Sequence, residues 1–482
     1  MEYVIGIDLG TSYFKVGLVD RNGKLRGLGR IAVPVQGTAS GYSEVSVDGF
    51  VNALKEGIAA ALTEGKARRE EIIGVSYSSQ ANSFLLLDRT GEPLTPLILW
   101  TDSRSDAMPR EFAELVTDPS FLSVTGIGVE LGPNSAIAKC LWFRDHEPVL
   151  YSRASRIMTI SDYLTYRFSG ELRGDEGTAS LLGIFDLKNE RLWEEGLKML
   201  RLPPSMFSEL MRPGSVAGRI SNDGAGDFGL PVGIPFAVGS LDHHMASVGA
   251  GIGFLADTSE STGTVLACIK LSERYEPKKN ACMGPGFDAG TYYTLVFNNN
   301  GAATYEWYGK EYGDGLSPRE LDAIAAEIAP GADGLCALPE AKRYGDLSGF
   351  VGAKAIHGKG HYSRAILEST AYSLSELVDM LAASDKVPNR MLATGGGARS
   401  DLWLSIQAAM VGTILVRTGV TEPACFGAAM SAACAAGIFP SVWEAGRSWI
   451  RMEKEFFPDK DWMKEYETWK KVYRTVKAQC VS

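Results

Sequence analysis

The chain has 482 residues, more than one hydrophobic core usually holds, so we expect two domains. Its net charge of −10 argues against duplex nucleic acid as a partner, because such proteins normally carry a basic face. No stretch reaches the about 20 apolar residues of a membrane span, and the N-terminus lacks a signal-peptide pattern. We therefore expect a cytoplasmic protein that binds neither nucleic acid nor a membrane.

The chain opens with the pattern of a β-meander. Residues 3–8, 14–20 and 25–35 are predicted strands, and Asn22-Gly23 is a strong hairpin turn because both residues tolerate positive φ. Apolar residues at helical spacing predict a helix over residues 50–63. The following predicted strands are 72–77, 84–88 and 97–100. Helical patterns then lie near 107–116, 136–145, 161–168 and 193–201.

The second half of the chain begins with the same pattern of predicted elements. Residues 258–269 again predict strand, tight turn and strand, with weak identity of letters to the first hairpin. Further predicted elements are a helix at 363–383, a strand at 391–394 and helices at 401–411 and 424–437. Because Gly and Pro become frequent over 213–239, we place the boundary just beyond, giving domains of residues 1–248 and 249–482.

Two turns have the composition of phosphate-binding loops. In the first, Gly10 lets the backbone approach a phosphate, and Thr11 and Ser12 add hydroxyl and N–H donors. Asp8, just before them, is positioned to hold a hydrated Mg²⁺. The turn Ser261–Thr264 repeats this chemistry, and two such hairpins could hold the phosphates of one nucleotide. An ordinary hairpin turn with a structural Asp is the alternative.

A third segment, Gly395-Gly396-Gly397-Ala398, lies between a predicted strand and a predicted helix. Small residues there allow a nucleotide to lie close to a helix N-terminus, although a plain turn would also accept them. The Walker pattern is absent from the sequence, and no GxGxxG fingerprint follows the first predicted strand, which disfavours a P-loop enzyme and a dehydrogenase.

Asp242 lies between an apolar run and a stretch of small residues, in Val238–His244. Together with the phosphate-like turns it suggests a general base for phosphoryl transfer from ATP to a hydroxyl. His243 and His244 are adjacent and point in different directions on a regular element, so at most one can face Asp242. No third ligand has suitable spacing for a metal site with this pair.

Taken together, these segments resemble the FGGY family of carbohydrate kinases over nearly the whole chain. Residues 3–17 resemble the family's first phosphate loop, and residues 73–104, ending in Trp100-Thr101-Asp102-Ser103-Arg104, its sugar-site signature. Residues 239–251 resemble the catalytic-base motif, and 394–398 and 422–429 the C-terminal half. The resemblance implies an α/β, two-domain ribonuclease-H-like fold, that of actin, hexokinase and the heat-shock ATPases.

The resemblance also implies roles. Asp242 would be the general base, Asp8 would hold Mg²⁺ through water, and ATP would be the cosubstrate lying between the domains. The implied nucleotide contacts are Asp8, Gly10, Thr11, Ser12, Lys15, Gly263, Thr264, Gly301, Gly396, Gly397 and Ala398. The implied sugar contacts are Gln80, Ala81, Asn82, Trp100, Asp102, Arg104, Asp242 and His243.

Two residues at the implied sugar site differ from relatives of known specificity. Ala81-Asn82 stand where glycerol kinases carry Arg-Glu and xylulokinases carry Met-His. We expect a small sugar or polyol longer than glycerol, most readily a ketopentose such as xylulose. Ribulose, a ketohexose or another polyol are alternatives, as is a nucleotide-dependent binding protein of the same fold. A homodimer is among the assemblies that the sequence allows for this protein.

Overall fold

The computed structural model describes residues 1–37, 41–105, 107–382 and 387–480. Contacts divide the chain into two compact units. The first comprises Met1–Gly249, Leu271–Thr294 and Val420–Ile450, and the second Ala250–Lys270, Leu295–Gly419 and the residues from Arg451 onward. The first unit thus takes up two segments from the second half of the chain, whereas the domain division after residue 248 stays a prediction.

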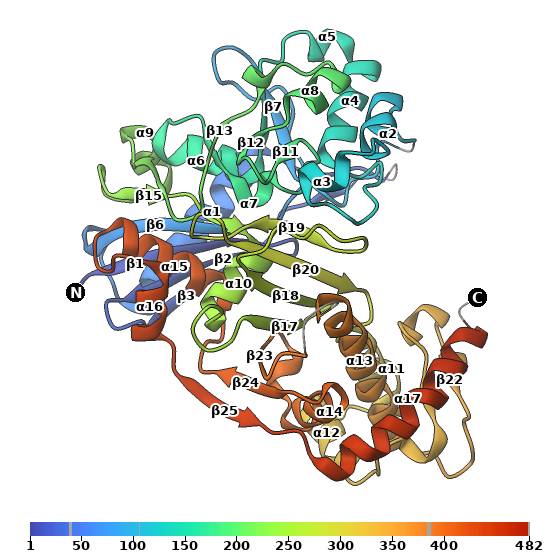
Figure 1. The fold of residues 1–482 in the computed structure, drawn as a ribbon. Coiled ribbons are helices and arrows are strands. Elements are labelled where there is room, and N and C mark those ends of the chain that lie inside the picture. Colours follow the sequence, from blue (N-terminus) through green and yellow to red (C-terminus); the bar gives the residue numbers. More distant parts are fainter. Residues whose placement is uncertain (38–40, 106, 383–386, 481–482) are drawn as a thin grey trace. The chain divides into compact units, whose positions relative to one another are not determined.

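A mixed sheet forms the centre of the first unit, in the order β14-β15-β6-β1-β2-β3 with β16 also on β6 (Figure 1). Its strands are β1 (Tyr3–Leu9), β2 (Tyr13–Asp20), β3 (Leu25–Ala32), β6 (Ile72–Ser79), β14 (Val216–Arg219), β15 (Pro235–Ala237) and β16 (Ser240–Leu241). The strands β1, β2 and β3 form the antiparallel meander, while β6 runs parallel to β1.

Two long helices of this unit pack on the central sheet, α1 (Val47–Gly65) on β2 and β3 and α15 (Pro423–Ala435) on β1 and β6. Glycines permit this close packing. A Cβ on Gly6 of β1 would lie 2.0 Å from the carbonyl oxygen of Cys425, and one on Gly29 of β3 would lie 1.9 Å from that of Gly57. The late segment of the chain that carries α15 therefore packs directly against the first sheet.

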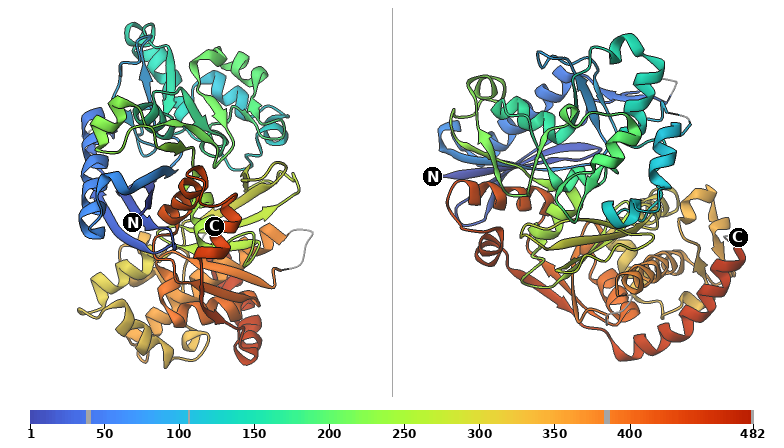
Figure 2. Two further views of the ribbon diagram at one scale, coloured as in Figure 1. Left: turned by 90° about the vertical axis from the view of Figure 1, so that its left-hand side faces the viewer. Right: turned by 45° about the horizontal axis from the view of Figure 1, so that its top comes forward.

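A second layer of the first unit carries a small sheet with the order β4-β5-β8-β7-β9. Its strands are β4 (Gln36–Gly37), β5 (Ser43–Val45), β7 (Phe84–Leu87), β8 (Leu97–Ile98) and β9 (Arg156–Thr159). Figures 1 and 2 show the helices α2 (Arg110–Val116), α4 (Ala136–His146), α5 (Pro148–Tyr151) and α8 (Glu194–Leu200) gathered at this end of the unit, away from α15.

The remaining elements of the first unit are short. The helices are α3 (Phe121–Thr125), α6 (Ile160–Ser169), α7 (Glu176–Ala179), α9 (Asn222–Phe228), α10 (Asp242–Ala250) and α16 (Val442–Trp449). Two strand pairs complete it, β10 (Arg173–Asp175) with β13 (Glu209–Met211) and β11 (Phe185–Asp186) with β12 (Arg191–Leu192).

The second large sheet has the order β19-β20-β18-β17-β23-β24-β25. Its strands are β17 (Thr258–Thr262), β18 (Leu266–Ser272), β19 (Cys282–Pro285), β20 (Tyr292–Asn298), β23 (Arg390–Thr394), β24 (Ile414–Thr418) and β25 (Met452–Phe456). As in the first sheet, an antiparallel hairpin, β17–β18, is joined on its other side by parallel strands, β23 and β24. The expected repeat is thus present, because the second sheet has the same arrangement of strands as the first.

Helices surround a second core in the second unit. They are α11 (Ala303–Tyr312), α12 (Pro318–Ala326), α13 (Lys359–Ala382), α14 (Asp401–Val411) and α17 (Lys460–Cys480), with the pair β21 (Cys336–Ala337) and β22 (Phe350–Val351). Aromatic side chains of α17 at helical spacing, Tyr466, Trp469 and Tyr473, are buried in this core. The helix α17 is therefore held by one apolar stripe.

The predicted elements agree with the observed ones except at their ends, and local chemistry explains the shifts. The third strand ends at Ala32, ahead of Pro34. Helix α1 begins earlier than expected because the Ser46 hydroxyl caps the N–H of Gly49 at 3.1 Å. Helix α2 starts only after Pro109. For the predicted helix 363–383, residue 383 lies outside the described residues.

The described cysteines are all unpaired, and five of the six are buried, as expected of small apolar side chains. Within the described parts of the chain, we find no helix long and apolar enough to cross a membrane.

Candidate active site

Three strands of the first sheet end side by side and bring the candidate residues together. In the parallel register, Asp8 of β1 pairs with Ser78 of β6, and Ser240 of β16 pairs with the same Ser78. The chain continues from these strand ends into the first turn, into Gln80 and into Asp242. Carboxyl ends of parallel strands are the usual place for ligands in α/β folds. Residues from three distant segments thus meet at one edge.

Asp8 is almost fully buried in a mixed-charge cluster. Its carboxylate accepts a hydrogen bond from the Ser78 hydroxyl at 3.1 Å and lies 3.5 Å from the Lys15 ammonium. The same ammonium is 2.9 Å from Glu422, which immediately precedes α15. Burial raises the pKa of Asp8 to about 6, with Lys15 opposing it and Asp242 and Glu422 adding to it. Lys15 therefore pairs with two carboxylates, and Asp242 adds a third negative charge near Asp8.

This excess of carboxylate suits a divalent cation. Oxygen ligands are those that Mg²⁺ prefers, and Mg²⁺ usually keeps several of its waters. No group of three or more His, Cys, Asp or Glu side chains among the described residues is arranged to ligate a metal directly. The cluster around Asp8 therefore fits an ion held through water better than one held in a protein cage.

Asp242 begins α10, directly after β16. Its Oδ1 accepts the N–H of His243 at 2.8 Å, which fixes the carboxylate while leaving Oδ2 without a bond in the described residues. The neighbouring His244 is buried, with its ring 4.6 Å from that of Tyr293 and its Nδ1 3.1 Å from the Ser240 hydroxyl. Burial lowers the pKa of His244 to about 3. His244 is thus a neutral packing residue, and the half-buried His243 stays beside Asp242.

The first predicted phosphate turn is linked to the predicted sugar loop through one hydroxyl. The indole N–H of Trp100 donates to the Thr11 Oγ1 at 2.9 Å, and that hydroxyl in turn lies 3.4 Å from the Gln80 Oε1. Thr11 and Ser12 are exposed, and Trp100 is 39% exposed although it is large and apolar. The turn is therefore open to solvent, and the indole offers an accessible face.

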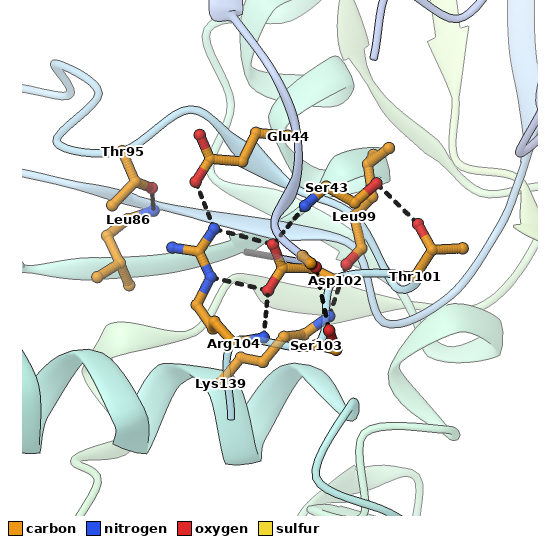
Figure 3. A network of polar contacts seen from close by, with 11 residues as sticks. Ser43, Glu44, Leu86, Thr95, Leu99, Thr101, Asp102, Ser103, Arg104 and Lys139 are labelled. Atoms are coloured by element: carbon orange, nitrogen blue, oxygen red, sulfur yellow. Dashed lines mark hydrogen bonds and ion pairs between the residues drawn. The ribbon is translucent and has the colours of Figure 1, made fainter. Parts of the chain in front are cut away.

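Asp102 and Arg104 hold the loop that carries Trp100 (Figure 3). The Arg104 Nε and Nη2 donate to the two Asp102 oxygens at 2.8 and 2.9 Å, a bidentate pair. Asp102 also accepts the backbone N–H groups of Ser43 and Arg104 at 2.7 and 3.0 Å. Burial raises the pKa of Asp102, but these bonds outweigh it and hold the pKa below its ordinary value.

The ion pair of Asp102 and Arg104 is buried, and further side chains surround it. Arg104 also binds Glu44, and its guanidinium lies 4.5 Å from the centre of the Tyr42 ring. Beneath the loop, the fully buried Lys139 of α4 donates to the Leu99 carbonyl at 2.6 Å. Direct sugar contacts by Asp102 and Arg104 stay a prediction, since their described bonds stay within the loop and its support.

Ala81 and Asn82 follow β6 and are half-buried. Asn82 adopts a left-handed φ of 61°, which Asn tolerates better than most residues. Its Oδ1 accepts the N–H of Ala136 at 3.0 Å, at the start of α4. Its Nδ2 donates to the Leu181 carbonyl at 3.5 Å. Both ends of the amide are thus engaged in the fold, and one N–H and a second oxygen lone pair are left to a ligand.

In the second unit, two glycine-containing segments converge on Thr262–Thr264. A Cβ on Gly301 would lie 2.4 Å from the Gly263 carbonyl oxygen, and one on Gly395 would lie 2.7 Å from that of Thr262. The Gly263 carbonyl accepts the N–H of Ala302 at 2.7 Å. Thr264 and Gly396 remain exposed, so backbone and hydroxyl groups of this cluster face solvent.

A cavity of about 1360 Å³ adjoins this cluster within the second unit. Its wall includes Gly396, Ser400, Trp403, Tyr305 and Trp462. Aromatic and small residues of this kind form an apolar slot with polar groups at its edge, which is the ordinary character of a nucleoside site.

Sequence patterns did not assign a role to several residues that the structure brings into these sites. Ser78 and Glu422 complete the Asp8 cluster, and Lys139 supports the sugar loop. A glutamate directly before a helix proline was a visible signal for Glu422. The pairing of Glu422 with Lys15, 407 positions away, has no local signature.

One known family matches two long segments of the chain. The N-terminal domain of the FGGY family of carbohydrate kinases matches residues 3–249, and its C-terminal domain matches residues 332–436. The chain belongs to the FGGY family of carbohydrate kinases and is an ATP-dependent sugar kinase. Its fold is the two-domain actin- and hexokinase-like fold expected from the sequence.

This chain is similar to relatives that are named for different substrates. A xylulose kinase of Bacillus subtilis is 27% identical over 99% of this chain and 97% of the relative. A gluconokinase of the same organism is 26% identical over 97% of this chain and 94% of the relative. The crystal structure of a xylulose kinase from Lactobacillus acidophilus superposes with a TM-score of 0.89 at 23% identity, covering 100% of this chain and 99% of that one.

Proposed function

We propose that this kinase transfers the γ-phosphoryl group of ATP to a primary hydroxyl of a neutral ketose, most readily a ketopentose such as xylulose. The meeting of Asp8, Gln80 and Asp242 at the ends of three neighbouring strands supports this proposal most strongly. It brings the proposed base, the proposed phosphate turn and the proposed sugar contact Gln80 to one edge of the sheet.

Asp242 is the proposed general base. A carboxylate held by the His243 N–H accepts the proton of the attacking hydroxyl as the new bond to phosphorus forms. In phosphoryl transfer the protein contributes mainly position and charge stabilisation, so a fixed base matters more than a strong one. The start of α10 provides that fixation.

The first turn would hold the phosphates. Gly10, Thr11 and Ser12 offer backbone and hydroxyl donors, and Lys15 supplies a positive charge beside Asp8. Asp8 would hold a hydrated Mg²⁺, which neutralises phosphate charge when bound.

The second unit is proposed to bind the rest of the nucleotide. Gly263, Thr264 and Gly301 form one cluster suited to phosphate oxygens. Gly396 lines the adjacent cavity, and Gly397 and Ala398 continue the same turn toward α14. The size and aromatic lining of the cavity support a nucleoside as its ligand.

The charges at the predicted sugar contacts favour a neutral sugar over an acidic one. A sugar acid such as gluconate needs a cation for its carboxylate. Of the predicted contacts, Arg104 is permanently charged, but its guanidinium is already paired with Asp102 and Glu44. The exposed indole of Trp100 and the remaining N–H and oxygen lone pair of the Asn82 amide suit a hydroxylated chain instead.

The test compares kcat/KM for xylulose, ribulose, fructose, gluconate and glycerol. We expect the best ketose to exceed gluconate and glycerol by at least about tenfold, since each buried polar group left unpaired costs about 1–3 kcal/mol. A preference for ribulose or fructose would keep the proposed class, a neutral ketose, and change only which ketose is the best substrate. A preference for gluconate would overturn the neutral-sugar proposal, and a preference for glycerol the proposed substrate length.

A further inference from the structure

Glu260 is a fully buried acid in a sheet strand of the second unit. Its Oε2 accepts the Thr262 hydroxyl at 2.7 Å, and the Thr262 oxygen accepts the side-chain amide of Gln407, on α14, at 2.9 Å. The second oxygen of Glu260 and the amide oxygen of Gln407 have no hydrogen-bond partner in the described part of the chain. The three side chains form a buried polar chain from β17 to α14.

This surrounding favours an uncharged carboxyl group. The residues that face Glu260 are Thr262 on its own strand, Thr394 on β23, Gln407 on α14 and the titratable thiol of Cys268 on β18. Burial raises the pKa of Glu260 to about 8, and the hydrogen bonds from Thr262 and Thr394 only partly oppose this. A neutral carboxyl group still accepts the Thr262 hydroxyl through its Oε2.

The chain of side chains lies directly behind two turns. Thr262 precedes Gly263 and Thr264, and the Thr394 hydroxyl donates to the Glu260 carbonyl at 2.9 Å. The glycine turn is pressed against the same threonine, because a Cβ on Gly397 would lie 2.6 Å from the Thr262 Cγ2. Any shift of Thr262 would therefore move the backbone of both turns.

We propose that Glu260 is a positioning residue for the nucleotide, whose neutral carboxyl holds Thr262 and thereby fixes the turns 262–264 and 394–397 in one geometry. The inference rests on the proposed function, in which these two turns bind ATP. Glu260 itself contacts no substrate and acts through the Thr262 hydroxyl.

The first experiment separates the KM for ATP from the KM for the sugar. In Glu260→Leu we expect the KM for ATP to rise at least about tenfold, since a small misplacement of binding groups is costly, with the sugar KM within about twofold. Glu260→Gln keeps a neutral acceptor of similar size and should stay within about threefold of the wild type. An unchanged KM for ATP in Glu260→Leu would overturn the proposal, as would equal losses in both variants.

The matched control is Glu368→Leu, a second fully buried glutamate of the same unit, which binds Arg364 on α13 and lies outside the turns. It should lower the melting temperature without changing the KM for ATP of the folded enzyme. A rise in its KM for ATP equal to that of Glu260→Leu would make the effect one of stability and overturn the positioning role. If Glu260→Leu does not fold, Thr262→Val removes the same hydrogen bond, and an unchanged KM for ATP there would equally overturn the proposal.

The pH profile gives a second readout. In the wild type the KM for ATP should rise above pH 8 as Glu260 ionises, whereas Glu260→Gln should show no such rise. Parallel profiles of the two proteins would contradict the neutral carboxyl. Failure of the proposed function is recognised separately, because an Asp242→Asn variant with normal turnover would remove Asp242 as base whatever Glu260 does.

Discussion

The two predicted phosphate turns are built alike but supported by opposite chemistry. Each follows the first strand of an antiparallel hairpin whose other side meets a parallel strand. Behind the first turn lie Asp8, Lys15 and Glu422, a cluster of charges. Behind the second lies Glu260, buried with Thr262 and Gln407 and without a facing cation among the described residues.

This difference teaches that one backbone motif can serve two purposes. The charged cluster costs desolvation and is worth keeping only where a cation or a reacting group uses it. The neutral chain costs less and gives shape without charge. We therefore expect substitutions behind the first turn to damage turnover, and substitutions behind the second to damage nucleotide affinity.

The largest expected effect is that of Asp242→Asn. Loss of the base should lower kcat by about 10²–10⁴, while sugar binding measured by calorimetry stays nearly unchanged. Asp223→Asn, an exposed acid in the first turn of α9, is the charge-matched control and should behave as the wild type. Most of the turnover surviving in Asp242→Asn would remove Asp242 from the mechanism.

Asp8→Ala should come next, with kcat/KM reduced by about 10–100-fold at ordinary Mg²⁺ concentration. Raising Mg²⁺ should restore part of the loss, because the variant lacks the group that holds the hydrated ion. Titrating Mg²⁺ against activity measures this. A wild-type Mg²⁺ dependence together with normal kcat would mean that Asp8 is structural.

A third prediction uses the raised pKa of both buried acids. A raised pKa means that the group's contribution to stability is full below the unfolded pKa and is lost as pH rises through the folded pKa. For Asp8 this loss of stability runs from pH 3.8 to about pH 6, and for Glu260 it runs from pH 4.5 to about pH 8.

Asp8→Asn and Glu260→Gln should therefore each stabilise the protein at pH 8, by roughly 1.4 kcal/mol for each pKa unit between the unfolded and folded values and hence more in Glu260→Gln. The gain of Asp8→Asn should level off between pH 6 and 7, whereas that of Glu260→Gln should keep growing up to pH 8. Urea unfolding midpoints at pH 5, 6, 7 and 8 distinguish the two windows. Gains independent of pH would show that neither acid has the protonation behaviour assigned to it.

The smallest effect is expected for Trp100→Phe, which keeps a ring but loses the hydrogen bond to Thr11. One neutral hydrogen bond contributes about 1 kcal/mol, so kcat/KM should fall about fivefold. Trp307→Phe, in the second unit, provides the matched control. A loss confined to the control, or none in Trp100→Phe, would break the link between the sugar loop and the first turn.

The sequence was informative where the chemistry is local. Apolar runs and Asn22-Gly23 were sufficient to predict the meander, whereas Asp242 was selected only in combination with the phosphate-like turns, and its role stays a prediction. It was less informative where a contact joins distant segments. The pairing of Lys15 with Glu422 and the burial of Glu260 depend on how strands and helices pack. The aromatic stripe of α17 was visible at helical spacing but was not used to predict that helix.

The central claim is tested most directly by following ATP and xylulose with the enzyme by ³¹P and ¹³C NMR. The account predicts one sugar phosphate for each ADP, with the phosphate on a primary hydroxyl carbon of the ketose. ADP formed without sugar phosphate, or phosphate on a secondary hydroxyl, would contradict it.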